Sequence, residues 1–208
     1  MADFYQNFAA LAAHNKAGKD YRIDCKMRSS AMSHIAIHGG GIEPGTSELA
    51  SVVSAQTGQS YYSFLGLKSS GNARLHITSN YFDEPVAVEL QKSVIRTLSY
   101  HGMKGDSPLT LVGGLDEQLK NAVCIALEEA GFTAERAGHY LLSGEGLSNI
   151  AHRNKSGMGA QLELSYNLRA SFFKGDDLSR LSRERGNYTD IFWRYVEVLV
   201  RVATQLPA

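Results

Sequence analysis

The sequence of 208 residues predicts an α/β fold: one three-layer αβα domain over residues 1–208, with a mixed, mostly parallel sheet. Three observations support this prediction. Short apolar runs alternate along the chain with amphipathic helical patterns. Glycines follow several of the apolar runs, where a strand would turn into the next helix. No repeat, low-complexity block or long linker divides the chain.

The first half of the chain contains two helical patterns and four strand-like runs. They predict helices over residues 4–14 and 46–57, and strands over residues 20–28, 33–37, 61–67 and 74–78. A hydroxyl of Thr46 or Ser47 can accept a hydrogen bond from the first free backbone amides of its helix, and Gly58 ends that helix. A turn signal over residues 69–72 separates the last two strands.

The second half continues the alternation. It predicts helices from Pro85 onward, over 115–130 and over 188–205, and strands over 94–100, 109–112 and 160–165. Proline just inside a helix and acidic residues in its first turn favour a helix start at Asp83–Pro85. The helix over 115–130 places its apolar residues on one face, and Gly131 supplies its stop. The charged tract of residues 176–185 is predicted to be a solvated helix face.

The composition limits the classes of partner. Lys plus Arg and Asp plus Glu both total 21, so the formal net charge is zero, which argues against nucleic acid as the main partner. No apolar run is long enough to span a membrane and no secretory signal is evident, so we expect a cytoplasmic protein, or one released by lysis of a host. The two cysteines, Cys25 and Cys124, are too few for a disulfide framework.

The most distinctive segment is the stretch from His38 to Glu48, HGGGIEPGTSE, which places an imidazole and a carboxylate on a loop almost without side chains. Such a loop can hold a metal ion, cradle a phosphate or form an oxyanion hole. A phosphate-binding P-loop would need a Lys-Ser/Thr pair at the helix start, and none follows. A His-Gly-Gly-Gly oxyanion hole would need a G-x-S-x-G nucleophile, which the chain lacks. A tight structural turn with glycines at positive φ stays an alternative.

Three polar residues follow or lie on separate predicted strands. His38 and His101 each follow a strand, and Glu163 lies on a third. Active sites of open α/β sheets gather beyond the carboxyl ends of the strands, so we expect these residues to meet. Two imidazoles and one carboxylate form a site for one zinc ion with a position open for water, and the best set is His38, Glu43 and His101. Glu163 is then free to act as general base on water that the metal acidifies.

Six segments resemble the signature blocks of the phage-type poly-gamma-glutamate hydrolases, small zinc enzymes similar in fold to the carboxypeptidase A group. They are His38–Glu48 (HGGGIEPGTSE), His76–Ser79 (HITS), Phe82–Pro85 (FDEP), His101–Gly105 (HGMKG), Gly113–Asp116 (GGLD) and Gln161–Ser165 (QLELS). The resemblance covers residues 20–170, with the blocks in the family's order. It implies a zinc carboxypeptidase-like core. His38, Glu43 and His101 are then the implied metal ligands, and Glu163 is the implied catalytic carboxylate.

The chemistry implied by this resemblance is hydrolysis of γ-linked glutamyl amides. Each repeat of such a polymer carries a free carboxylate, which a guanidinium matches best. Asn149 and Arg153, just before the predicted strand 160–165, are the first candidates for binding it. Arg169 is a second candidate, and His76 is a candidate for contact with the substrate. The family tends to have an asparagine immediately before this arginine, whereas here that residue is a histidine, which leaves the identity of the substrate open.

The leading hypothesis is a monomeric zinc-dependent hydrolase that cleaves γ-glutamyl amide bonds of an anionic polymer, poly-gamma-glutamate. A virus could use it to strip a polyglutamate capsule from its host. A second hypothesis keeps the zinc but changes the substrate to another peptide or a cell-wall amide. A third is a non-catalytic viral accessory or nucleic-acid-binding protein, which predicts basic and aromatic residues clustered on one face, whereas here Lys and Arg are scattered. The remaining histidines are expected to occupy surface or structural positions: His14, His34, His139 and His152.

Overall fold

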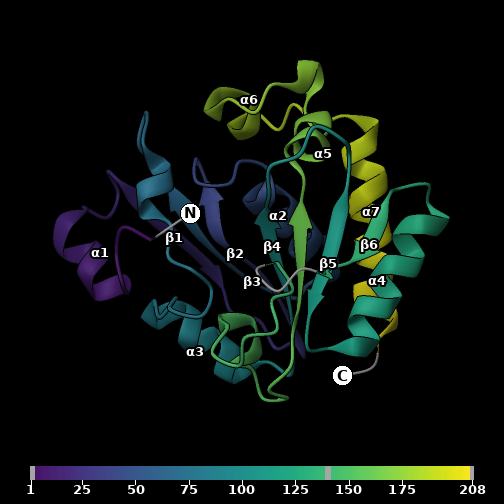
Figure 1. The fold of residues 1–208 in the computed structure, drawn as a ribbon, viewed down its shortest axis with the longest axis horizontal. Helices are drawn as coiled ribbons and strands as arrows, with labels where there is room; N and C mark the ends of the chain where they lie inside the picture. The colour runs from purple at the N-terminus through teal and green to yellow at the C-terminus, as the bar shows by residue number, and fades with distance from the viewer. Residues whose placement is uncertain (1–2, 139–141, 207–208) are drawn as a thin grey trace.

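A seven-stranded sheet runs through the centre of the computed structural model, which describes residues 3–138 and 142–206 (Figure 1). The spatial order of the strands is β1-β3-β2-β4-β7-β5-β6. Their bounds are β1 Tyr21–Lys26, β2 Met32–Gly40, β3 Ser60–Gly66, β4 Arg96–Gly102, β5 Thr110–Gly114, β6 Ala134–Arg136 and β7 Ala160–Leu164. β2, β4 and β7, which carry candidate site residues, are therefore neighbours in the middle of the sheet. His139 lies outside the described residues.

The sheet is mixed and mostly parallel, as the sequence predicts. β2 pairs in parallel with β3 and with β4, β4 pairs in parallel with β7, and β5 pairs in parallel with β6. β1 is antiparallel to β3, and β5 is antiparallel to β7. Because β2, β4 and β7 run in the same direction, their carboxyl ends meet at one edge. His38, His101 and Glu163 all come to that edge.

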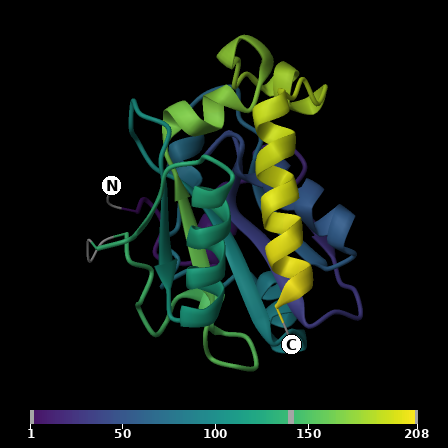
Figure 2. The ribbon, with the colours of Figure 1, turned by 90° about the vertical axis from the view of Figure 1, so that its right-hand side faces the viewer.

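Helices cover both faces of the sheet and complete the predicted three layers. Their bounds are α1 Phe8–His14, α2 Thr46–Thr57, α3 Pro85–Ser93, α4 Glu117–Glu129, α5 Tyr166–Ser171, α6 Arg180–Glu184 and α7 Asp190–Gln205, with 3₁₀ turns η1 Asn72–Leu75, η2 Ile150–His152 and η3 Lys174–Asp176. One hydrophobic core joins α2, α4 and α7 to one face, where Figure 2 shows α4 and α7 side by side. A second core joins α1 and α3 to the other face. α5 and α6 lie beyond the ends of the strands (Figure 1).

Alternation along β3 shows how one strand serves both cores. Tyr61 belongs to the core of α2, α4 and α7, and Tyr62 belongs to the core of α1 and α3. Successive side chains of a strand point to opposite faces, so a sheet covered on both sides reads as a nearly continuous apolar run. All seven residues of β3 are buried. This burial explains why the sequence predicts the central strands well.

An irregularity in β2 helps to direct His38. The register between β2 and β3 shifts between Ala36 and Gly39, which marks a bulge. A bulge changes the direction of a side chain relative to regular alternation. The His38 ring reaches the carbonyl oxygen of Ile77, and Ile77 lies in the same core as Ile37, the residue before His38. The His38 ring thus contacts the segment that follows η1.

Several predicted boundaries are wrong. Residues 74–78 do not form a strand, because η1 ends there and the chain then continues without regular structure. The Asn72 side chain bonds to both the backbone amide and the carbonyl oxygen of Lys68, which closes a tight loop instead. β2 is longer than predicted, and β4 starts and ends two residues later than predicted, so His38 and His101 lie within strands rather than after them.

The predicted cap of α2 is also wrong. Gly45, at φ 97°, is the N-cap, and the Glu48 carboxylate accepts a hydrogen bond from its backbone amide at 3.2 Å. The Thr46 hydroxyl donates to a carbonyl oxygen, and the Ser47 hydroxyl accepts from the amide of Gly40, so neither caps the helix. Both hydroxyls bond instead to groups of the loop that precedes the helix.

The tract 176–185 is only partly the solvated face that the sequence predicts. Most of its residues are exposed or half-buried, but Ser182 and Arg183 are buried. The Arg183 guanidinium pairs with the Glu48 carboxylate at 2.6 Å, which ties α6 to the start of α2.

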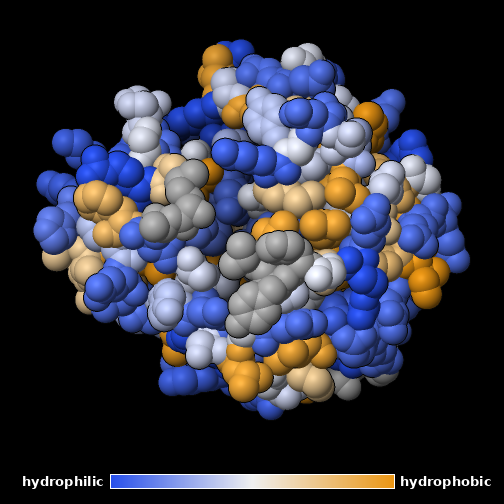
Figure 3. All heavy atoms as spheres, viewed as in Figure 1, coloured by the Kyte–Doolittle hydropathy of each residue, from blue (hydrophilic) through white to orange (hydrophobic). Residues whose placement is uncertain are grey.

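The face seen in Figure 1 is mainly polar at its rim, with apolar residues gathered near its centre (Figure 3). Among the described residues, no helix has the length and apolar character that crossing a membrane requires.

Candidate metal and catalytic site

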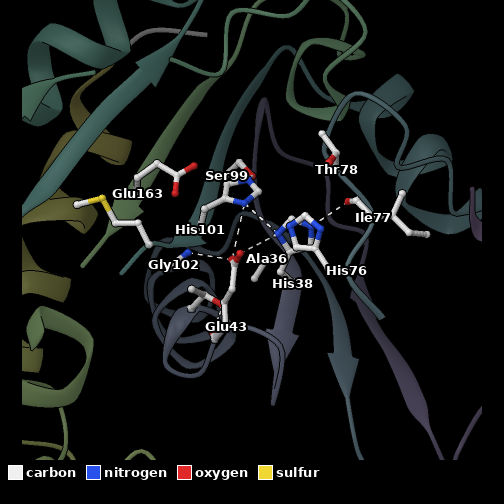
Figure 4. Close-up of polar contacts among 12 residues, drawn as sticks. Ala36, His38, Glu43, His76, Ile77, Thr78, Ser99, His101, Gly102 and Glu163 are labelled. Atoms are coloured by element: carbon white, nitrogen blue, oxygen red, sulfur yellow. Dashed lines mark hydrogen bonds and ion pairs between the residues drawn. The ribbon is translucent and has the colours of Figure 1, made fainter. Parts of the chain in front are cut away.

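His38, Glu43 and His101 converge at the carboxyl ends of β2 and β4 (Figure 4). The Nδ1 atoms of His38 and His101 lie 3.2 Å apart. The Glu43 carboxylate lies 3.2 Å from the His38 Nδ1 through Oε1 and 3.8 Å from the His101 Nδ1 through Oε2. Both imidazoles are buried. The fold thus brings together the three residues that the sequence predicts as metal ligands.

Neighbouring groups determine which nitrogen of each imidazole faces the centre. His38 Nε2 lies 2.9 Å from the carbonyl oxygen of Ile77, which can only accept, so Nε2 carries the proton and Nδ1 presents a lone pair. His101 Nε2 is hydrogen-bonded to Ser99 Oγ at 2.9 Å, which leaves its Nδ1 toward the centre. Histidine ligands of metal ions typically have such a partner on the outer nitrogen.

The spacing of these atoms suits a zinc ion. Ligands at about 2.0–2.1 Å from a tetrahedral zinc ion lie about 3.3 Å from one another. The two nitrogens and the nearer carboxylate oxygens are separated by 3.2, 3.2 and 3.8 Å. Two buried imidazole Nδ1 atoms that face each other beside a carboxylate are a donor set that fits zinc.

The charge of Glu43 dominates the electrostatics of the centre. Burial acts to raise its pKa, but His38, His101 and the backbone amide of Gly102 stabilise the carboxylate and hold the pKa at about 2. Burial lowers the pKa of His101 to about 3 in spite of Glu43, so this imidazole is neutral at pH 7. Burial also acts to lower the pKa of His38, but the adjacent Glu43 carboxylate more than offsets this effect and raises it.

His76 lies beside this centre in a different orientation. Its ring stacks on His38, with centroids 3.9 Å apart and planes inclined by 26°. Its Nδ1 lies 2.7 Å from the carboxylate of Asp3. Ligand atoms of His38, Glu43 and His76 do lie within 4.8 Å of one another. Stacked rings, however, direct their lone pairs side by side rather than toward one point, so the geometry favours His101 as the third ligand.

Glu163 lies on β7, directly opposite His101 in the ladder with β4. Its side chain points toward the histidines (Figure 4), and its Oε1 accepts a hydrogen bond from Gln161 Nε2 at 2.9 Å. Burial and the negative charge of Glu43 raise the pKa of Glu163 well above its usual value, while Arg169 and Gln161 act in the opposite direction. A buried carboxyl group with a raised pKa beside a metal-like donor set has the character of a proton-transfer group.

The first two predicted carboxylate-binding residues make contacts within the protein. Asn149 is buried, and its amide donates to Gln161 Oε1 at 3.0 Å. Arg153 is half-buried and donates to the carbonyl oxygens of Ser148 and Asn80 at 3.0 and 3.3 Å. Of the two, Arg153 keeps more of its side chain accessible.

Arg169 is buried and connects three segments of the site. It donates to the carbonyl oxygens of Leu164, Pro44 and Met103 at 3.1, 2.7 and 3.1 Å. Each carbonyl lies within two residues of Glu163, Glu43 or His101 in the chain. The guanidinium also fills the space beside Gly102, where a Cβ would lie 2.7 Å from its central carbon.

Two residues of the site were not identified from the sequence. Ser99 precedes His101 by two positions on one strand, so alternation places both on the same face, and that signal was present. Asp3 holds His76 across a separation of 73 residues, and no local pattern connects the two.

Residues 5–198 match the family of poly-gamma-glutamate hydrolases. The chain is 38% identical over 201 residues to the SPbeta prophage-derived UPF0714 protein YoqZ of Bacillus subtilis (strain 168), an alignment that covers 96% of this chain and 71% of that protein. Its fold is similar to that of a bacteriophage poly-gamma-glutamate hydrolase, with a TM-score of 0.95, 40% identity and 98% of both chains covered. It is also similar to the zinc-free structure of YndL, with a TM-score of 0.92, 36% identity and 98% of both chains covered. The chain therefore belongs to the poly-gamma-glutamate hydrolase family and is a hydrolase.

Proposed function

We propose that this protein is a zinc-dependent hydrolase that cleaves the γ-glutamyl amide bonds of poly-gamma-glutamate. The observation that carries this proposal is the convergence of His38 Nδ1, His101 Nδ1 and the Glu43 carboxylate, with separations of 3.2 to 3.8 Å. Membership of the poly-gamma-glutamate hydrolase family supports the substrate, and the zinc-free form described for the similar protein YndL supports the metal.

His38, Glu43 and His101 would hold one zinc ion through two Nδ1 atoms and a carboxylate oxygen. When bound, zinc would act as a Lewis acid that polarises an amide carbonyl and lowers the pKa of water. Ile77 and Ser99 hold the outer nitrogens of the imidazoles, so the rings are already oriented for ligation.

Glu163 is the residue that removes the proton from the attacking water. Gln161 occupies Oε1, so Oε2 is the atom that accepts the proton. A general base works best when its pKa approaches the working pH, and burial together with the Glu43 charge raises the pKa of Glu163 in that direction. The same carboxyl group can then donate the proton to the leaving amine.

The substrate carries a carboxylate on every repeat, which needs a cationic or hydrogen-bonding partner near the centre. Arg153 is our candidate, because its guanidinium is half-buried and carries more donors than its two backbone acceptors use. His76, stacked on His38, is a second contact for the substrate. For Asn149 and Arg169 we propose internal roles, since their polar groups are bonded within the protein.

Elemental analysis of the purified protein tests the metal. We expect one zinc ion per wild-type chain and its loss in His38→Ala. A wild-type protein that takes up no zinc after incubation with it would contradict the proposal.

Polymer cleavage tests the substrate. Wild-type protein is expected to shorten poly-gamma-glutamate in size-exclusion chromatography and to leave α-linked polyglutamate intact. Glu163→Gln is expected to keep its zinc but to cleave about 10²- to 10⁴-fold more slowly. A zinc-loaded wild type that leaves the γ-linked polymer intact would favour an amidase acting on another peptide or on a cell-wall amide.

A further inference from the structure

A chain of hydrogen-bonded side-chain amides leads from the backbone of η2 to Glu163. The backbone amide of Ala151 donates to Asn149 Oδ1 at 3.0 Å. Asn149 Nδ2 donates to Gln161 Oε1 at 3.0 Å. Gln161 Nε2 donates to Glu163 Oε1 at 2.9 Å. We refer to Asn149 and Gln161 as the amide chain.

One backbone group determines the orientation of both amides. A backbone N–H can only donate, so the Asn149 atom that faces Ala151 must be its oxygen. The Asn149 nitrogen then faces Gln161, and it also donates to the carbonyl oxygen of Gly144 at 3.2 Å, which a flipped asparagine could not do. Gln161 must therefore turn its oxygen to Asn149 and its nitrogen to Glu163. The Glu163 carboxylate therefore faces the N–H donor of Gln161 and not its carbonyl oxygen.

Packing leaves these side chains little freedom to rearrange. Asn149, Gln161 and Glu163 are only 2%, 4% and 7% exposed. Gly144, at φ 65°, lies so close to Gln161 that a Cβ at this position would overlap the glutamine side chain. The absence of a side chain at Gly144 thus makes the space that Gln161 occupies.

We propose that Asn149 and Gln161 are positioning residues that hold the Glu163 carboxylate in the orientation that its reaction needs. Gln161, oriented by Asn149, donates to Oε1 and leaves Oε2 to accept a proton. This inference rests on the proposed role of Glu163 as general base. It assigns Asn149 to the base rather than to the substrate carboxylate.

Asn149→Asp tests the proposal, because it preserves the size of the side chain but replaces the donor with an acceptor. Gln161 must then turn its nitrogen toward position 149 and its oxygen toward Glu163, whose charge it repels. We expect kcat to fall about 10- to 100-fold, with KM and zinc content unchanged.

Asn15→Asp is the matched control. Asn15 is also buried, and its Nδ2 donates to the Leu11 carbonyl oxygen at 2.9 Å and to the Tyr5 hydroxyl at 3.0 Å. It follows α1, which packs against the edge strand β1, whereas Glu163 lies on β7. We expect Asn15→Asp to lower thermal stability, as Asn149→Asp does, but to keep the wild-type kcat.

A second variant tests whether Asn149 acts through Gln161. Gln161→Met removes the donor at nearly constant length, and its kcat is expected to fall in the same range. In that background Asn149→Asp should cause no further decrease, because the intermediate group is already absent. In zinc-free protein labelled with ¹⁵N, the Gln161 side-chain amide signal, identified by its loss in Gln161→Met, should shift in Asn149→Asp and stay in place in Asn15→Asp.

Three results would overturn the proposal: a wild-type kcat in Asn149→Asp, equal losses of kcat in Asn149→Asp and Asn15→Asp, or fully multiplicative losses in the double variant. Failure of the proposed function has a different signature. Full activity in Glu163→Gln would remove Glu163 as the base, whatever the amide variants do, and the proposal with it.

Discussion

The Nδ1 atoms of His38 and His101 face each other at 3.2 Å, although the two residues lie 63 positions apart in the chain. β2 and β4 are adjacent parallel strands, which brings the two side chains to the same edge. The Ile77 carbonyl oxygen and the Ser99 hydroxyl hold the outer nitrogens. The orientation of the rings is therefore a property of the folded chain, and an ion bound between them would find its donors already directed inward.

His101 and His76 both lie next to His38, but their substitution is expected to affect metal binding differently. His101→Ala removes one of three convergent donors and should abolish stoichiometric zinc. His76→Ala should keep one zinc per chain and weaken its affinity by at most about tenfold, because this ring stacks on a ligand without facing the centre. Elemental analysis and competition with a chelator measure both effects. Zinc retained in His101→Ala and lost in His76→Ala would exchange the roles of the two histidines.

Arg169→Lys is expected to loosen the centre. A lysine ammonium cannot reproduce the planar fork that bonds to the carbonyl oxygens of Pro44 and Met103, on the loops that follow Glu43 and His101. We expect zinc affinity to weaken about 10- to 100-fold and the free energy of unfolding to fall by about 1–3 kcal/mol.

The control for Arg169 is Arg96→Lys. Arg96 is largely buried but stands at the first residue of β4, the end opposite the candidate site. Its replacement should lower the free energy of unfolding without changing zinc affinity. Equal losses of zinc affinity in the two variants would mean that Arg169 acts only through general stability.

Stability should fall below neutral pH because of His34. This imidazole is fully buried and hydrogen-bonded to Tyr100 and Gln59, and burial lowers its pKa from 6.5 to about 4. Between these two values the unfolded chain binds a proton that the folded chain does not, so the contribution is complete above pH 6.5 and is lost as the pH falls toward 4. The loss amounts to about 3 kcal/mol.

Urea unfolding of zinc-free protein at pH 7.5 and at pH 4 measures this effect. His34→Gln, which preserves hydrogen bonding without titrating in this range, should show a pH dependence smaller by about 3 kcal/mol. An unchanged difference between the two pH values in this variant would assign the acid sensitivity to other groups.

Gly39→Ala should destabilise the protein through overpacking. A Cβ there would lie 2.8 Å from the Ser47 Cβ and 2.9 Å from the Leu65 Cδ2, where little can move. We expect a loss of about 1–3 kcal/mol in the free energy of unfolding. At Gly138 an added Cβ would meet no atom of the described residues within 4 Å, so Gly138→Ala should change it by less than about 0.5 kcal/mol.

Much of the fold could be predicted because its elements have strong periodic patterns. The helices over α4 and α7 were predicted from apolar residues at helical spacing, and these residues lie in the core. The predicted strand over residues 74–78 failed because its β-branched residues were only a local preference. The chain there is held instead by the Asn72 loop and by Asp3, whose carboxylate binds His76 and the backbone amide of Thr78.

The candidate site shows the same division. The sequence alone allowed the selection of four site residues, His38, Glu43, His101 and Glu163. Predicted strand ends, residue types that bind metals and segments that resemble the family can all be recognised in it. The distances between these residues could not be predicted, because the distances depend on the order of β2, β4 and β7 in the sheet. Arg169 illustrates this limit. It is buried and bonded to three backbone carbonyl oxygens, but nothing in the neighbouring sequence distinguishes it from an exposed arginine.

The sequence by itself determined the alternation of strands and helices, the residue types available at the strand ends and the family to which the chain belongs. Only the tertiary structure decided that His76 stacks on His38 and binds Asp3, and that Asn149 bonds to Gln161. The physical reason is that hydrophobic periodicity is a local property of the chain. The direction of a lone pair or an amide hydrogen depends on partners far away in the chain, such as Asp3 and His76, which are 73 residues apart.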